Sequence, residues 1–202
     1  MNGVNGVNGV THLTLPNALS ALRIVLAPVL LVLAYLGRNE AFVAVLVVSL
    51  VSDILDGKLA RWLNQQSELG ARLDSWGDFA TYMTVPLCAY WLKPEVLAQE
   101  APWFWLVVGC YTVPVAIGFL KFRTLTSYHT RGAVISAYLV GAGSVLFFAD
   151  GPLWCFRAAS LVLLLAELEE IAITAVLPEA VTNVKSLQVA LAHRRRLLHR
   201  GQ

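Results

Sequence analysis

The sequence predicts an all-α integral membrane protein with six transmembrane helices and a short N-terminal interfacial helix. Of its 202 residues, 57% are hydrophobic and only 14% are charged, which is more apolar material than a soluble domain of this size buries. Six apolar stretches are long enough, or nearly so, to cross a bilayer as helices. They are residues 18–36, 41–62, 74–92, 103–121, 132–149 and 153–177. We therefore expect one six-helix membrane domain over residues 13–180.

The chain begins with a polar extension that we expect to be disordered. Residues 1–12 contain Asn-Gly-Val repeats and almost no charge, which is typical of a flexible, low-complexity tail. Residues 13–22 are expected to form the interfacial helix, starting at Pro16 and placing Arg23 near the membrane surface. No convincing small-residue cleavage site follows the first apolar run, so we do not expect a secretory signal.

Basic residues predict the orientation in the membrane. An even number of helices places both termini on one side, together with the second-to-third and fourth-to-fifth loops. That side holds most of the Lys and Arg residues, and the positive-inside rule makes it cytoplasmic. We expect residues 181–202 to be a basic cytoplasmic tail. The basic residues on this side are Lys58, Arg61, Arg72, Lys121, Arg123, Arg131, Lys185, Arg194, Arg195, Arg196 and Arg200.

Two pairs of aspartates at the membrane edge are the main candidates for chemistry. Asp53 and Asp56 are three residues apart, and Asp74 and Asp78 are four apart, so each pair shares one face of a helix. Four carboxylates in one pocket repel one another unless they are protonated or bind cations. Oxygen ligands without His or Cys suit Mg²⁺, Mn²⁺ or Ca²⁺ rather than zinc. Mg²⁺ in turn suggests a substrate that carries phosphate.

The residues between the two pairs fit such a substrate. Gly57 and Ala60 are small and lie on or beside the first aspartate face, so a ligand can approach the backbone. Arg61 offers a planar fork of donors that matches phosphate oxygens. Gly70 opens the next helical element just ahead of Asp74. A metal-bridged diphosphate is the expected ligand.

These residues resemble the signature of the CDP-alcohol phosphotransferase family, D-x-x-D-G-x-x-A-R-x(8)-G-x-x-x-D-x-x-x-D. The resemblance implies a membrane enzyme that transfers a phosphatidyl group from CDP-diacylglycerol to an alcohol and releases CMP. It implies Mg²⁺ or Mn²⁺ bound by the four aspartates, with Asp78 also as general base, and CDP-lipid binding by Asp74 and the other motif residues. The matching positions are Asp53, Asp56, Gly57, Ala60, Arg61, Gly70, Asp74 and Asp78.

The same resemblance sets expectations for partners and location. It implies a homodimer embedded in membrane lipid, in a bacterial inner membrane, with the active site facing the cytoplasm. No nucleic-acid partner is expected. A membrane transporter for divalent cations or coupled to protons is the alternative from another class. Transport would favour acids in the middle of helices and inverted repeats with broken helices, and the sequence shows neither.

A looser match concerns the acceptor alcohol. The run Leu15-Pro16-Asn17-Ala18-Leu19-Ser20, followed by Arg23 and Pro28, resembles the opening of the phosphatidylglycerophosphate synthase and cardiolipin synthase branch. This resemblance favours glycerol 3-phosphate as acceptor. That branch commonly continues the third aspartate as Asp-Pro-x-Ala-Asp-Lys, whereas this chain reads Asp74-Ser75-Trp76-Gly77-Asp78-Phe79. Phosphatidylglycerol, inositol phosphate and serine therefore remain alternatives.

Two further clusters of charge have open interpretations. Lys121, Arg123 and Arg131 lie at the cytoplasmic ends of the fourth and fifth apolar stretches, where they either bind a phosphorylated acceptor or only anchor helix ends. Three glutamates interrupt the sixth stretch, where they either pair with these cations or mark an earlier exit from the bilayer. The glutamates are Glu167, Glu169 and Glu170. We expect the three cysteines, Cys88, Cys110 and Cys155, to be packing residues.

Overall fold

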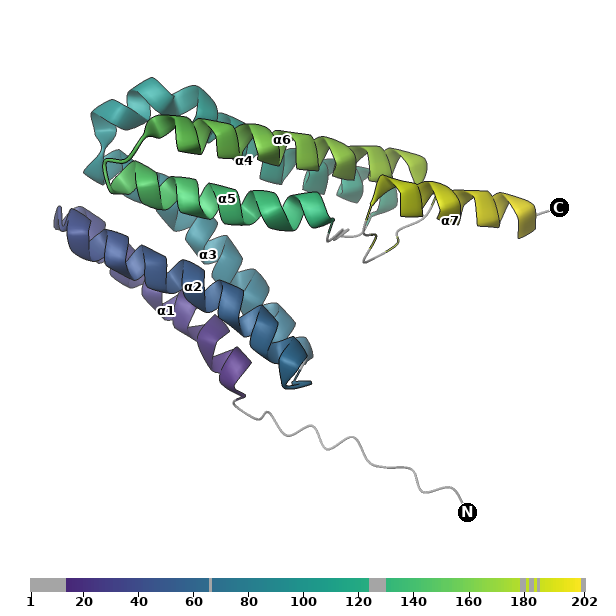
Figure 1. Ribbon diagram of the computed structural model, residues 1–202, viewed down its shortest axis with the longest axis horizontal. Coiled ribbons are helices and arrows are strands. Elements are labelled where there is room, and N and C mark those ends of the chain that lie inside the picture. Colours follow the sequence, from purple (N-terminus) through teal and green to yellow (C-terminus); the bar gives the residue numbers. More distant parts are fainter. Residues whose placement is uncertain are drawn as a thin grey trace, which may run out of the picture. The chain divides into compact units, whose positions relative to one another are not determined.

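Helices are the only regular secondary structure in the described part of the chain. The computed structural model describes residues 14–65, 67–123, 130–178, 181, 184 and 186–200, and these residues form seven helices and no strand (Figure 1). The expected N-terminal tail, residues 1–12, lies outside this part of the chain. The helices are α1 (Leu15–Tyr35), α2 (Asn39–Trp62), α3 (Glu68–Leu92), α4 (Pro94–Phe122), α5 (Arg131–Phe148), α6 (Leu153–Val176) and α7 (Leu187–Arg200).

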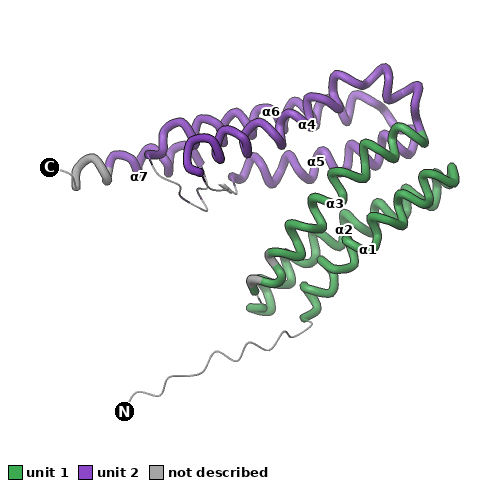
Figure 2. The backbone as a smooth tube through the Cα atoms, turned by 180° about the vertical axis from the view of Figure 1, so that it is seen from behind, with its two compact units in different colours: residues 1–92 green, residues 93–202 purple. Residues whose placement is uncertain are grey.

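The chain divides into two compact units, residues 1–92 and residues 93–202 (Figure 2). In the first unit, α1 makes the main helix contacts, with α2 on one side and α3 on the other. Leu30, Phe42 and Leu46 are fully or almost fully buried in this unit. Side chains from α2 and α3 can therefore meet residues of α1 that lie between them.

Helix α1 is continuous, so the expected interfacial helix is its first turns rather than a separate element. The Thr14 hydroxyl accepts a hydrogen bond from the Asn17 amide at 3.4 Å, and Pro16 stands in the first turn, where proline is compatible with a helix. Pro28 lies inside the helix without ending it. Gly37 has a φ of 67° and follows the helix in the turn toward α2.

Helices α3 and α4 begin six or more residues before the apolar stretches predict. Helix α3 starts at Glu68 instead of residue 74, because the Ser67 hydroxyl accepts a hydrogen bond from the Gly70 amide at 3.0 Å and caps the first turn. Helix α4 starts at Pro94 instead of residue 103, with proline in its first turn, and it continues through Pro102. Hydropathy marks the lipid-soluble part of a helix and not its capped ends.

The second unit is organised around α6, which contacts α4, α5 and α7 (Figure 1). Cys110, Val140, Ala159 and Leu163 form a buried cluster that joins α4, α5 and α6. All three cysteines are free, and Cys88 and Cys110 are buried, which agrees with the expected packing role.

The basic tail contains a helix that hydropathy did not predict. Residues 187–200 form α7, and its Ala190 is fully buried in a cluster with Ile173, Leu177 and Val184. Lys185 lies outside the described residues. Docking of apolar side chains onto the end of α6 gives this basic segment a helical structure that its charge alone does not favour.

Three of the described helices are long and apolar enough to cross a membrane, namely α1, α4 and α5. Helices α2 and α3 are as long, but they carry the motif aspartates together with Lys58, Arg61 and Arg72, and α6 carries the three glutamates. The lower count has a chemical cause, because the residues expected to do chemistry reduce the apolar character of the helices that hold them.

Candidate metal centre

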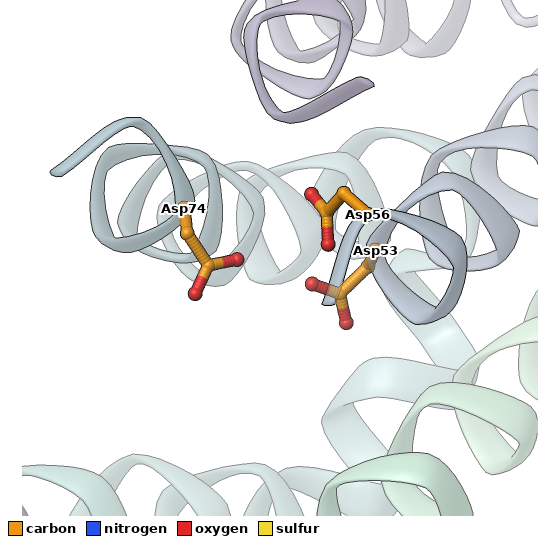
Figure 3. A group of neighbouring side chains, drawn as sticks. All are labelled: Asp53, Asp56 and Asp74. Atoms are coloured by element: carbon orange, nitrogen blue, oxygen red, sulfur yellow. The ribbon is translucent and has the colours of Figure 1, made fainter. Parts of the chain in front are cut away.

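The two aspartate pairs lie on helices that face each other. Asp53 and Asp56 project from α2 and Asp74 projects from α3, and Figure 3 shows the carboxylates of the two helices pointing toward one another. One ligand oxygen from each of these three residues lies within 4.8 Å of the other two. Helical spacing places each pair on one face, and the packing of α2 and α3 against α1 brings the faces together.

Arg23 of α1 lies at the centre of the four carboxylates. Its Nη2 donates to Asp74 Oδ1 at 2.7 Å and lies 3.9 Å from Asp56 Oδ2. Its Nη1 donates to Asp78 Oδ1 at 2.8 Å and also to Asp53 Oδ1. The Arg23 side chain is only 3% exposed. A single guanidinium thus offsets part of the repulsion among four acids from two helices.

Two more polar residues of α1 complete the buried face that carries Arg23. The Ser20 hydroxyl donates to Asp56 Oδ2 at 2.7 Å, and both residues are buried. Asn17 is also buried, and a Cβ placed on Gly70 would lie 2.6 Å from Asn17 Oδ1. Glycine at position 70 therefore lets α3 approach α1 closely, a packing role that the sequence interpretation did not anticipate.

The site is closed at Asp56 and open at α3, and the side chain of Asp53 on α2 is 33% exposed. The Asp56 side chain is 4% exposed, whereas those of Asp74 and Asp78 are 49% and 48% exposed. A ligand can therefore reach the α3 carboxylates, while Asp56 is held between Ser20 and Arg23. The donor set consists of carboxylate oxygens alone, which suits hard divalent cations. The positively charged Arg23 guanidinium already lies among these oxygens. The residues present fit a Mg²⁺ or Mn²⁺ site.

The small residues of the motif leave open space beside this cluster. Gly57 is exposed, and a Cβ there would meet only Arg61 Nη2, at 4.0 Å. Arg61 is exposed and donates from Nε to the Gly57 carbonyl at 2.9 Å. Ala60 is half-buried. The Arg61 guanidinium thus lies on the surface of α2, one turn beyond Gly57 and bonded back to it.

The expected acceptor residues belong to the second unit. Lys121 donates from Nζ to the carbonyls of Thr174 and Ala175, at 2.7 and 2.9 Å. These carbonyls lie in the last turn of α6, where a cation stabilises the helix end. Arg123 and Arg131 are exposed. Lys121 therefore has a structural role as a helix cap, whether or not it also meets a ligand.

The glutamates of α6 bind polar groups of neighbouring segments. Glu169 Oε1 accepts from the Leu187 amide at 3.0 Å, at the start of α7, and Glu170 Oε1 accepts from the Thr130 hydroxyl at 3.4 Å. Glu167 is buried. Among the described residues, no ion pair joins the glutamates to Lys121, Arg123 or Arg131. Helix α6 continues past all three glutamates to Val176.

Sequence reasoning identified the aspartates but missed the roles of Ser20 and Arg23. Ser20 entered it only through the looser family match. Arg23 entered it through that match and as a residue expected near the cytoplasmic surface of the membrane. A usable signal exists, because Asn17, Ser20 and Arg23 recur every three residues in an otherwise apolar helix. Such a polar stripe predicts a face turned toward protein and not toward lipid.

Comparison with known proteins identifies the family of this chain. The family model for CDP-alcohol phosphatidyltransferases matches residues 13–183, which include all four aspartates and Arg23. The chain belongs to this family. It is a transferase of phospholipid synthesis and a membrane protein.

Relatives within the family carry two kinds of name. A putative cardiolipin synthase of Mycobacterium tuberculosis is 33% identical over 150 residues, covering 70% of this chain and 68% of the relative. The human CMP-forming cardiolipin synthase is 31% identical, covering 72% of this chain and 57% of the relative. A CDP-diacylglycerol–serine O-phosphatidyltransferase of M. tuberculosis is 28% identical, covering 63% and 43%. No solved structure shows a significant match.

Proposed function

We propose that this CDP-alcohol phosphatidyltransferase uses a divalent cation, Mg²⁺ or Mn²⁺, to transfer a phosphatidyl group from CDP-diacylglycerol to an alcohol, with release of CMP. The observation that carries the proposal is the convergence of Asp53, Asp56 and Asp74, whose ligand oxygens lie within 4.8 Å of one another. Asp78 joins this group through Arg23. Carboxylates this close favour a bound cation, because it offsets their mutual repulsion, and a divalent cation suits a diphosphate substrate.

The motif residues divide the reaction between them. Asp53, Asp56 and Asp74 would hold the metal, with Asp78 beside it or as a further ligand. A bound divalent metal supplies charge stabilisation for the diphosphate and for CMP as leaving group. Gly57 leaves space for the CDP group. Arg61, exposed one turn further along α2, is placed to bind a phosphate oxygen.

Asp78 is the proposed general base. The acceptor hydroxyl loses its proton to the Asp78 carboxylate while its oxygen forms a bond to the phosphorus that carries diacylglycerol. The bond from that phosphorus to the CMP oxygen breaks, and CMP leaves with the electron pair. The Asp78 side chain is 48% exposed, so a hydroxyl can come within hydrogen-bond reach, as a general base requires.

Two acceptors are favoured by separate observations. Glycerol 3-phosphate is favoured by the opening run that ends in Ser20 and Arg23. Phosphatidylglycerol is favoured by the relatives that are named cardiolipin synthases. A phosphorylated acceptor needs basic partners, and Arg123 and Arg131 are exposed and available for this role. Lys121 would contribute only if it left its α6 carbonyls.

The remaining proposals concern the membrane. We propose that α2, α3 and α6 cross the bilayer with the three apolar helices, giving six spans with both termini in the cytoplasm. The basic residues near the adjoining ends of α2 and α3, and of α4 and α5, support this orientation. The active site would then face the cytoplasm of a bacterial inner membrane. A homodimer is proposed from the family resemblance alone.

An acceptor panel tests the proposed function. Purified protein in detergent is given CDP-diacylglycerol and Mn²⁺, and CMP release is followed while glycerol 3-phosphate, phosphatidylglycerol, inositol phosphate and serine are offered in turn. We expect CMP release that depends on one of the first two acceptors and is lost in Asp74→Asn. The lipid product is identified by mass. Release with serine alone would reject both proposed acceptors, and no release with any acceptor would reject the reaction.

A further inference from the structure

We propose that Arg23 is an internal counter-cation that competes with divalent metal for the motif carboxylates. This inference rests on the proposed function, because it requires that the carboxylates bind metal. It adds a residue of α1 to a site whose motif lies entirely on α2 and α3.

The first observation is that Arg23 bonds the same carboxylates that would hold the metal. The guanidinium bonds Asp53 Oδ1, Asp74 Oδ1 and Asp78 Oδ1, and it lies 3.9 Å from Asp56 Oδ2. Three of these four residues form the set whose ligand oxygens lie within 4.8 Å of one another. A cation held by these carboxylates would therefore lie directly beside the guanidinium or take its place.

The second observation is the charge of the group. An arginine side chain stays protonated in proteins, so it cannot leave the site by losing a proton. A divalent cation entering beside it meets a like charge at short range, in surroundings where the Arg23 side chain is only 3% exposed and screening by salt is weak. Metal binding must therefore displace Arg23 or work against its charge.

The third observation shows that the present position of Arg23 leaves one of its donors unpaired. Its Nε is buried and has no hydrogen-bond partner among the described residues. Buried N–H groups are normally paired, so displacement of the guanidinium removes an unfavourable feature as well as favourable bonds. Arg23 thus stabilises the metal-free arrangement without being locked into it.

Arg23 therefore has opposite effects in the two states. Without metal it offsets the repulsion among the four carboxylates, which would otherwise push α2 and α3 apart. When metal is offered, it lowers the affinity of the site for that metal. A residue that merely positioned the carboxylates for metal would raise the affinity. The sign of the change on removing Arg23 distinguishes the two roles.

The test is Mn²⁺ binding to the purified full-length protein in detergent, measured by titration calorimetry without substrate. We expect Arg23→Gln to bind Mn²⁺ about tenfold more tightly than the wild type, because a like charge close to the metal is removed. Arg72→Gln is the matched control. Arg72 is exposed on α3 and makes none of the ion pairs found among the described residues, so its loss should change the affinity by less than about twofold.

A second readout and a second variant keep the test decisive. Without metal, Arg23→Gln should melt at a lower temperature than the wild type, and Mn²⁺ should raise its melting temperature by more. Arg23→Lys keeps the charge but not the fork that spans several carboxylates, so its affinity should lie between those of the wild type and Arg23→Gln. This variant decides the matter if the glutamine variant does not fold.

Three outcomes would overturn the proposal. Unchanged or weaker Mn²⁺ binding in Arg23→Gln, or in Arg23→Lys if only that variant folds, would make Arg23 a positioning residue. An equal gain in affinity in Arg72→Gln would reduce the effect to general electrostatics. No Mn²⁺ binding by the wild type or any variant would reject the metal centre of the proposed function and this proposal with it.

Discussion

Replacing Ser20 by alanine tests whether the buried face of α1 belongs to the catalytic site. The Ser20 hydroxyl donates to Asp56 Oδ2 at 2.7 Å, and the two residues are only 3% and 4% exposed. Because both groups are buried, water cannot easily replace the lost donor. The change removes the hydrogen bond to Asp56 and a longer one from the same hydroxyl to the Pro16 carbonyl, at 3.3 Å. It leaves the backbone of α1 intact, since alanine is the best helix former.

The magnitude follows from the charge and burial of this hydrogen bond. A hydrogen bond to a charged group contributes about 1.5–3 kcal/mol, and loss of a group that orients a metal ligand lowers affinity or activity by about 10–100-fold. We expect the lower end, because Asp56 also lies 3.9 Å from the Arg23 guanidinium and keeps part of its orientation. Mn²⁺ affinity and kcat/KM should each fall about tenfold, opposite in sign to the affinity change in Arg23→Gln.

Two variants serve as controls for Ser20→Ala. Ser52→Ala removes a buried hydroxyl from α2 one turn before Asp56, but that hydroxyl donates to the Ser49 carbonyl at 2.8 Å and not to a carboxylate. It should leave Mn²⁺ affinity unchanged. Ser20→Thr keeps a hydroxyl and should restore most of the affinity. Mn²⁺ binding by Ser20→Ala within about twofold of the wild type would refute the reasoning, as would an equal loss in Ser52→Ala.

Three further predictions concern the base and the second unit. Asp78→Asn should cut turnover by about 100-fold or more with little change in CDP-diacylglycerol binding measured at equilibrium; equal losses in both would make Asp78 primarily a metal ligand. Gly143→Ala should lower the free energy of unfolding by about 1–2 kcal/mol in denaturant titrations, because the new Cβ would lie 3.0 Å from the Phe156 Cα on α6. An unchanged denaturation midpoint would show that α5 and α6 move apart enough to admit the new Cβ without loss of stability. Glu100→Gln should lower the melting temperature, because Glu100 is buried and accepts from Arg157 at 2.5 and 2.9 Å; an unchanged melting temperature would mean that this ion pair does not stabilise the packing of α4 on α6.

The aspartate cluster could be predicted because its information is local. Asp53 and Asp56 are three residues apart and Asp74 and Asp78 are four apart, which is close to one helical turn in each case. Periodicity alone therefore places each pair on one face. The short connection between the two helices makes their approach plausible. The chemistry of the side chains then predicts a hard divalent cation.

The contribution of α1 could not be predicted in the same way. Arg23 is 30 residues from Asp53 and 55 from Asp78 along the chain, and no local pattern specifies which helix lies between α2 and α3. The polar stripe of Asn17, Ser20 and Arg23 shows that one face of α1 turns inward, but not what that face meets. Only the packing of α1 between its two neighbours provides the partner.

Helix ends and the C-terminal segment were the least predictable parts of the fold. Hydropathy placed the start of the third helix at residue 74, whereas the Ser67 cap starts α3 at Glu68. Helix α7 has a basic sequence that is typical of a solvated tail. Its fold depends on tertiary contact, since Ala190 packs against Ile173 and Leu177 of the α6 end. These features come from hydrogen bonds and contacts that composition does not record.

The metal dependence of CMP release is the most direct test of the carboxylate centre. Purified wild-type protein is treated with EDTA, freed of chelator, and assayed with CDP-diacylglycerol and either glycerol 3-phosphate or phosphatidylglycerol while Mg²⁺ or Mn²⁺ is added back. We predict that CMP release is absent without metal and returns in a saturable manner with metal. CMP release that persists in the metal-free protein would contradict a metal centre formed by Asp53, Asp56 and Asp74.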